Sequence, residues 1–137
     1  MAHEKFRVEV LTPEGEVFND EVEMVSTRTA VGSIGVLANH APVLAMLDPT
    51  ELHLYVSESD VVSFAQAEGY MQVANNHVMI LVEEAHRPED LDAGSLRDRL
   101  QNAERELERA EDDSERRRVA ERDKRRFERF VQIAESH

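Results

Sequence analysis

The chain has 137 residues, and its 29 acidic and 16 basic side chains give it a formal net charge of −13 at pH 7. This acidic excess argues against a nucleic-acid-binding protein, and the absence of cysteine excludes disulfides and thiolate metal sites. Apolar runs such as residues 78–82 are far too short to span a membrane, and the N-terminus lacks an apolar signal core, so we expect a soluble protein that reaches a membrane only through a partner.

Alternation of apolar and polar residues marks the first 87 residues. It is clearest over residues 6–10, 21–24, 52–57 and 62–66, and this period of two is typical of strands with one buried face. Residues 78–82 are apolar on both faces and predict a central strand. Turn residues separate the runs, as at Pro13-Glu14-Gly15 and Asn75-Asn76. Many short strands without a helical period predict a β-sandwich or a flattened barrel.

The segment from Gly32 to Pro42 reads Gly-Ser-Ile-Gly-Val-Leu-Ala-Asn-His-Ala-Pro. Two glycines three residues apart interrupt an apolar run, and the proline fixes the direction in which the chain leaves. The segment therefore predicts a strand, a tight turn and a second strand. The structural reason for such glycines is that they permit a positive φ, which does not exclude a binding role.

The pattern changes at Pro88. An apolar seam at spacings of four and three predicts an amphipathic helix; its members are Leu96, Leu100, Ala103, Leu107 and Ala110. Asp112-Asp113-Ser114 then offers a new N-cap. A second helix follows, whose expected apolar side is Val119, Ala120, Phe127, Phe130, Val131 and Ala134. The short connection predicts an antiparallel hairpin, so we expect two domains, residues 1–87 and residues 88–137.

Charge is distributed unevenly between the two segments. Residues 1–90 carry 16 acidic and 4 basic side chains, whereas residues 91–137 carry 13 and 12, which predicts different partners for the two parts. The second helix holds arginines at spacings of four: Arg118, Arg122, Arg125, Arg126 and Arg129. We expect them to pair across the hairpin with an acidic ridge formed by Glu104, Glu108 and Glu111. Because exposed pairs contribute only about 0–1 kcal/mol, another acidic partner could compete for the arginines.

The string Gly-x-Ile-Gly-Val-Leu-x-Asn-His-Ala-Pro-Val-Leu resembles the signature of the epsilon subunit of the F-type ATP synthase. Residues 6–15, 69–73 and 78–83 and the junction Asp90-Leu91-Asp92 are also similar to this family. The resemblance implies a fold that is mainly β plus α, with about ten strands in an N-terminal β-sandwich followed by the two-helix hairpin.

The same resemblance implies a non-catalytic rotor subunit of the central stalk. Such a subunit links gamma to the c-ring, couples proton translocation to ATP synthesis, and carries C-terminal helices that inhibit ATP hydrolysis. The implied partners are the gamma subunit, the c-ring and the alpha and beta subunits, without nucleic acid. The implied location is peripheral, at the cytoplasmic face of the inner membrane, and the isolated chain is expected to be a monomer.

Three sets of site residues follow from the resemblance. The loop implied to contact the c-ring contains Gly32, Ser33, Ile34, Gly35, His40, Ala41 and Pro42, where Ser33 replaces a common glutamate and offers only a neutral hydrogen bond. The five arginines of the second helix are implied to contact an acidic segment of the beta subunit. Extended as one helix, residues 91–137 would span about 70 Å at 1.5 Å per residue. A regulatory ATP site would use Asp92, Arg125 and Arg129.

Ser95 and Leu96 stand where the ATP-binding motif has arginine and alanine. We therefore expect weak or absent ATP binding, no other cofactor, and Asp92 acting as a helix N-cap. The six scattered histidines form no metal-binding pattern, so no metal is expected. Two other functions remain open: a free-standing β-sandwich adaptor with a coiled-coil interaction tail, and, less favoured, a small-molecule enzyme that would need a pocket with converging polar groups.

Overall fold

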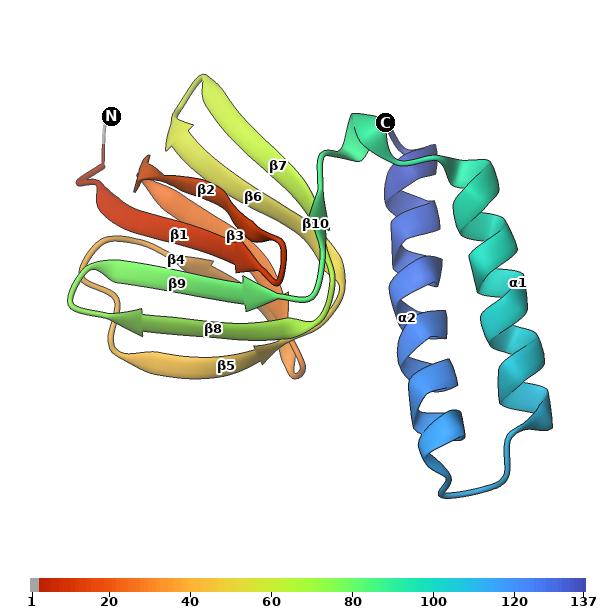
Figure 1. Cartoon of the computed structure of the whole chain (residues 1–137). Coiled ribbons are helices and arrows are strands. Elements are labelled where there is room, and N and C mark those ends of the chain that lie inside the picture. Colours follow the sequence, from red (N-terminus) through yellow and green to blue (C-terminus); the bar gives the residue numbers. More distant parts are fainter. Residues whose placement is uncertain (1–2) are drawn as a thin grey trace. The chain divides into compact units, whose positions relative to one another are not determined.

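The structure is a computed structural model that describes residues 3–137. It consists of two compact units that divide between Arg87 and Pro88, and each is described here by itself (Figure 1). The strands of the first unit are β1 (Phe6–Thr12), β2 (Gly15–Val22), β3 (Met24–Thr29), β4 (Gly32–Val36), β5 (Val43–Leu47), β6 (Thr50–Ser57), β7 (Asp60–Gln66), β8 (Gly69–Ala74), β9 (His77–Val82) and β10 (Ala85–His86).

The ten strands form a sandwich of two layers that are joined at one edge. One layer has the order β10-β7-β6-β3-β4 and the other has the order β5-β8-β9-β1-β2. The layers connect through β3 and β5, which share a single register pair, Thr29 with Leu47. All neighbours are antiparallel except β1 and β9, which are parallel. The β-sandwich and helical hairpin predicted from the residue pattern, and the count of about ten strands implied by the resemblance, are confirmed.

The core of the sandwich is built from the alternating apolar residues that the sequence indicates. Side chains such as Phe6, Val8, Leu52, Leu54 and Ile80 are fully or almost fully buried between the layers. All the buried side chains of this core cluster lie between Phe6 and Val82 in the sequence. The first unit therefore has a hydrophobic core of its own.

The expected single alternating strand at residues 21–24 is wrong. There β2 ends at Val22 and β3 begins at Met24, because the chain crosses from one layer of the sandwich to the other. Glu23 at the crossing is buried, and its N–H donates to the carbonyl of Tyr55 at 2.7 Å. Periodicity cannot reveal this crossing, since alternation continues through it.

The connection between β8 and β9 is a two-residue hairpin turn at Asn75-Asn76. Both asparagines have positive φ, 52° and 57°, as the type I′ turn that suits the twist of a β-hairpin requires. Asparagine tolerates this conformation better than most residues. The turn predicted at this position is confirmed.

Gln66 is a fully buried polar residue at the end of β7. Its side-chain amide donates to the carbonyl of Asp48 at 3.0 Å, and its side-chain oxygen accepts from the Thr27 hydroxyl at 2.8 Å. Both groups are thereby paired, as buried polar groups must be. The amide joins β7 to β3 and to the turn before β6.

Replacing Gln66 with leucine is expected to lower the free energy of unfolding by about 1–3 kcal/mol, because two buried polar groups lose their partner. Chemical denaturation of the full chain measures this change. The double variant Q66L/T27V removes the hydroxyl as well, and should recover part of the loss. Equal stability of Q66L and the wild type would show that the pairing contributes nothing.

The second unit is a helical hairpin. It contains a short 3-10 helix, η1 (Pro88–Asp90), and the helices α1 (Ala93–Arg109) and α2 (Glu115–Glu135). The Asp92 side chain accepts from the Ser95 N–H, and the Ser114 side chain accepts from the Arg117 N–H. Both are N-caps of the expected kind, so the caps predicted at these two positions are confirmed.

The helices pack along the seam that the sequence predicts, with differences on α2. The α1 seam residues Leu96 and Ala103 are buried, and Ala120 and Phe130 of α2 are buried as well. Ile133, absent from the expected apolar side, is also buried, whereas Val119 is exposed. Each buried set is small, so the hairpin has little apolar contact to hold it together.

Candidate partner-binding surfaces

The residues predicted to form one contact loop lie at two different ends of the sandwich. Gly32 begins β4 at the β3–β4 turn, and β4 runs to Val36 before the chain reaches the turn at residues 37–42. A strand of five residues spans roughly 17 Å. Gly32 and Ser33 therefore lie at one end and His40, Ala41 and Pro42 at the other (Figure 1). The expectation of a single contact loop is wrong, although the predicted strand-turn-strand order is correct.

The β3–β4 end is a tight hairpin with an apolar tip. The Thr29 hydroxyl donates to the carbonyl of Gly32 at 2.9 Å and accepts from the Val31 N–H, and Gly32 has a φ of 141°, which favours glycine. Val31 at the tip is 98% exposed. Ser33 is also exposed and lies opposite Arg28 in the strand register. This tip offers apolar contact and neutral hydrogen bonds to a partner.

The turn that contains His40 is tied to the β8–β9 turn. Asn39, with a φ of 65°, exchanges hydrogen bonds with Asn76: the Asn39 N–H donates to the side-chain oxygen of Asn76, whose amide donates back to the Asn39 side chain. A third bond joins Asn39 to Glu4 at 3.0 Å. Within residues 3–137, His40 forms hydrogen bonds only in its own loop, with the carbonyls of Leu37 and Ala41. These bonds hold the loop in place, and they give His40 no catalytic neighbour.

An exposed apolar row crosses the outer face of β5, β8 and β9. Met46 pairs in register with Tyr70, Tyr70 with Leu81, and Leu81 with Leu11. Met46, Tyr70 and Leu81 are 62%, 53% and 47% exposed, and Leu44 beside them on β5 is 72% exposed. We call Leu44, Met46, Tyr70 and Leu81 the apolar face. A contiguous exposed surface of this kind marks an interaction site.

Sequence reasoning did not identify this face. One sequence feature could have revealed it: residues 43–47 and 78–82 are apolar at every position. Since only one face of each strand packs on the core of the sandwich, the other face would need a partner to cover it. The strand predicted to be central at residues 78–82 does lie between two neighbours, β8 and β1. Its outward side is nevertheless exposed at Leu81.

The ion pairs between the helices differ from the expected ridges. Across the hairpin, Arg97 pairs with Glu135 at 2.6 Å and Arg116 pairs with Glu106 at 2.7 Å. Among residues 3–137, no ion pair joins an arginine of α2 to the ridge residues Glu104, Glu108 and Glu111. The expected pairing with Glu104, Glu108 and Glu111 is therefore wrong, and the pairs across the hairpin use Glu106 and Glu135 instead.

The five arginines of α2 do not form one surface. Arg118, Arg122 and Arg125 are exposed, Arg129 is half-buried and Arg126 is only 8% exposed. Arg118 bonds to Glu115 at 2.6 Å and Arg122 to Asp123 at 3.1 Å, both on α2 itself. In this compact hairpin the three exposed arginines are accessible to a partner, whereas Arg126 is not.

Asp92 is engaged by the backbone of α1. Its carboxylate accepts from the Ser95 N–H at 3.2 Å, and among the described residues no hydrogen bond or ion pair joins it to Arg125 or Arg129. The three residues of the expected ATP site are thus not connected in this structure.

Arg116 donates a hydrogen bond to Glu106 and holds the pKa of that carboxyl below its usual value. Both side chains are solvent-exposed. A carboxyl with a lowered folded-state pKa adds stability above its unfolded pKa and loses it as the pH falls through the folded value. The bond therefore supports the hairpin at neutral pH and fails in acid.

Replacing Glu106 with glutamine is expected to speed amide hydrogen exchange in α1 and α2 at pH 7. Because protonation also breaks the wild-type pair, the difference between variant and wild type should disappear as the pH falls well below 4.5, the usual value for the group. Glu108→Gln is the matched control, since Glu108 forms no ion pair within residues 3–137. A pH-independent difference would contradict this assignment.

Neither a metal site nor a membrane span is found in the described part of the chain. Residues 3–137 contain no group of three or more His, Asp or Glu side chains that could hold a metal ion. No helix within that range is long and apolar enough to cross a membrane.

Comparison with known proteins places these features in a family. Residues 5–88 match the family model of the ATP synthase delta/epsilon chain β-sandwich domain. The ATP synthase epsilon chain of Rubrobacter xylanophilus is 35% identical over 130 residues, which are 91% of this chain and 88% of that protein. The epsilon chain of Persephonella marina is 36% identical over 106 residues, 77% of this chain and 78% of its own length.

A solved structure supports the fold over nearly the whole chain. A chain of the Euglena gracilis mitochondrial ATP synthase, in a structure of its OSCP/F1/c-ring, superposes with a TM-score of 0.77 at 22% identity, covering 97% of this chain and 82% of that one. At this identity the likeness concerns the fold. On the family match and the relatives together, the chain belongs to the epsilon subunits of the F-type ATP synthase and is a subunit of the central stalk of that rotary complex.

Proposed function

We propose that this chain is a non-catalytic rotor subunit that fastens gamma to the c-ring and so couples proton translocation to ATP synthesis. The observation that carries the proposal is the apolar face of Leu44, Met46, Tyr70 and Leu81. Burial of apolar area is the main driving force of association. The apolar face is the part of this acidic unit that gains from being covered by a partner. We assign the face to gamma.

The c-ring contact is proposed at the β3–β4 tip alone. Val31 is almost fully exposed there, and Gly32 and Ser33 follow it at the start of β4. A partner that meets one end of the sandwich cannot also touch the opposite end, so His40, Ala41 and Pro42 are excluded from an end-on contact. Without a glutamate at Ser33, the contact relies on apolar burial and neutral hydrogen bonds.

The helical hairpin is proposed as the inhibitory element. In the compact state the exposed Arg118, Arg122 and Arg125 are available to an acidic segment of the beta subunit. Arg126 is buried in this state. The small apolar seam between the helices makes opening of the hairpin inexpensive, which supports a role in blocking ATP hydrolysis.

Regulation by ATP is proposed to be weak or absent. Asp92 caps α1, and Ser95 replaces a guanidinium that would hold phosphate through paired hydrogen bonds. We also propose that the isolated chain is a monomer and that the assembled subunit lies at the cytoplasmic face of the membrane. A free-standing adaptor is less well supported, because the similarity to epsilon chains extends over 130 residues and includes the helices.

Hydrolysis of ATP by a reconstituted α3β3γ complex tests the proposal, with the full-length chain and with a version truncated after Asp90. The truncated chain keeps the whole sandwich core. We expect both to bind and only the full-length chain to suppress hydrolysis. Binding of both without inhibition would remove the inhibitory role but keep the coupling role. Failure of both to bind would overturn the rotor function.

A further inference from the structure

We propose that the groove between β4 and β5 receives an extended segment of gamma, the partner to which the apolar face is assigned above. This segment adds to β5 as an extra strand. The inference rests on the proposed function, since it concerns the same partner. It adds a main-chain mode of recognition to the apolar contact proposed above.

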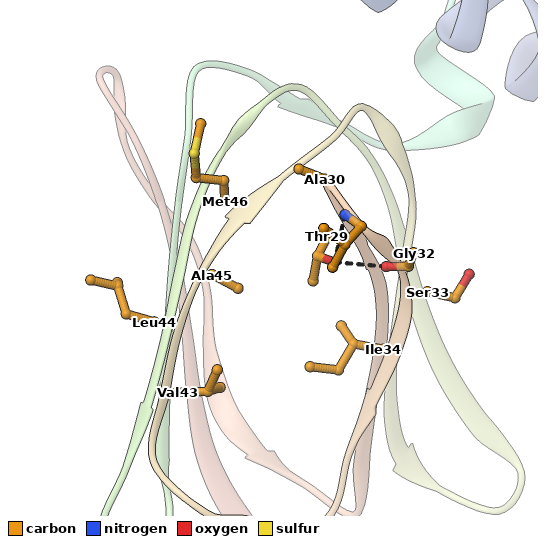
Figure 2. Close-up of a pocket in the computed structure, with 10 residues that line it drawn as sticks. Thr29, Ala30, Gly32, Ser33, Ile34, Val43, Leu44, Ala45 and Met46 are labelled. Atoms are coloured by element: carbon orange, nitrogen blue, oxygen red, sulfur yellow. Dashed lines mark hydrogen bonds between the residues drawn. The ribbon is translucent and has the colours of Figure 1, made fainter.

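The groove lies where the two layers of the sandwich separate. It has a volume of about 520 Å³ and is lined by the β3–β4 hairpin on one side and by residues 43–46 of β5 on the other. Figure 2 shows Ile34, Val43 and Ala45 directed into the space between the strands, while Leu44 turns away from it. The lining is apolar and accepts apolar side chains.

The backbone edge of β5 faces this groove. The Ala30 N–H donates to the carbonyl of Met46 at 3.0 Å, and the Asp48 N–H donates to the carbonyl of Arg28 at 3.1 Å. The polar backbone groups of residues 46 and 48 therefore point toward the β3 side. In a strand, residues two apart point their N–H and C=O groups the same way, so Leu44 N–H, Leu44 C=O and Met46 N–H also point there.

These three groups have no strand beside them within residues 3–137. β3 pairs with β5 only at Thr29 and Leu47, and β4 pairs with β3 alone. β4 and β5 therefore each have an open strand edge. Such edges template pairing with another chain, and natural proteins usually protect them with charged residues or bulges. Between Met24 and Leu47 the only charged side chain is Arg28.

The chemistry of the groove specifies its occupant. A segment with apolar side chains at alternating positions would place them on Ile34, Val43 and Ala45 and offer its backbone to Leu44. Residues 24–47 contain no acidic side chain, although residues 1–90 carry 16. The groove also adjoins the apolar face, because Leu44 and Met46 border the groove and also present exposed side chains to the apolar face. One partner can therefore cover both surfaces.

Amide hydrogen exchange of the full chain, free and bound to α3β3γ, tests the added strand. The amides of Leu44 and Met46 are expected to exchange about 100-fold more slowly in the complex. Unchanged exchange at both amides in a complex that forms would overturn the strand addition and leave the rotor function standing. Failure of the chain to bind α3β3γ would overturn both.

Substitutions at Ala45 give a second, independent readout. Ala45→Phe fills the groove and leaves the apolar face intact, so affinity for α3β3γ is expected to fall by about tenfold or more. Ala45→Val fills less of the groove and should give a smaller loss with the fold retained. Val61→Phe on β7, in the other layer of the sandwich, is the matched control. Wild-type affinity in both Ala45 variants would overturn the proposal.

Discussion

Replacing Gly69 with alanine is expected to lower the free energy of unfolding of the β-sandwich by about 4 kcal/mol or more. A Cβ atom at this position would overlap the carbonyl oxygen of Leu81 and lie 2.8 Å from the Cα of Val82. Both neighbours are backbone atoms, which cannot rotate away as a side chain does. The strand cannot shift either, because Gly69 pairs with Leu47 of β5 on one side and with Val82 of β9 on the other.

The loss is a large part of the 5–15 kcal/mol by which a domain is typically stable. Chemical denaturation of the full chain measures this loss of free energy, and hydrogen exchange of the amides in β8 and β9 shows whether it is located there. Gly35→Ala is the matched control, since its nearest neighbour would be the flexible end of Met24 at 3.4 Å, and it should cost less than about 1 kcal/mol. Similar stability of the two variants would show that the close approach at Gly69 is relieved by movement of the sheet.

A double substitution of the apolar face, Met46→Glu with Tyr70→Glu, is expected to weaken binding to α3β3γ by about 100-fold or more. The two side chains are register partners at the centre of the row, so each carboxylate would have to be buried unpaired against an apolar surface. Both residues are exposed in the isolated chain, and the substitutions should leave its thermal unfolding midpoint nearly unchanged.

Val61→Glu is the matched control for this variant. Val61 is 43% exposed and lies on β7, in the other layer, so its substitution adds a single carboxylate away from the proposed interface. Equilibrium binding and thermal unfolding are measured for both. Equal affinity of the double variant and the control would remove the apolar face from the gamma interface, and the rotor proposal would need another docking surface.

The compact hairpin makes the five arginines of α2 unequal for the proposed inhibitory role. Arg126 is buried, whereas Arg118, Arg122 and Arg125 are exposed. If inhibition uses only the compact hairpin, the three exposed arginines carry it. If it requires the extended form, Arg126 contributes as well. The five arginines that look equivalent in the sequence are therefore not equivalent in the folded chain.

Local features of the sequence determined much of this protein. Alternating residues such as Phe6, Val8 and Val10 identify strands, and the caps Asp92 and Ser114 identify helix starts. Both patterns depend only on residues a few positions apart in the sequence. The string from Gly32 to Pro42 identified the family without any knowledge of where its residues lie. Fold class, the two-part organisation and the central-stalk assignment required nothing further.

Contacts between distant segments were decided by the tertiary structure alone. Gln66 is paired across 39 residues to Thr27, and the row from Met46 to Leu81 exists only because β5, β8 and β9 are neighbours. The separation of Gly32 from His40 follows from the course of β4 between them, and the pairing of Arg116 with Glu106 follows from the register of the two helices. Strand order and helix register set these relations, and both result from packing each unit around its own buried residues, a property that no local pattern encodes.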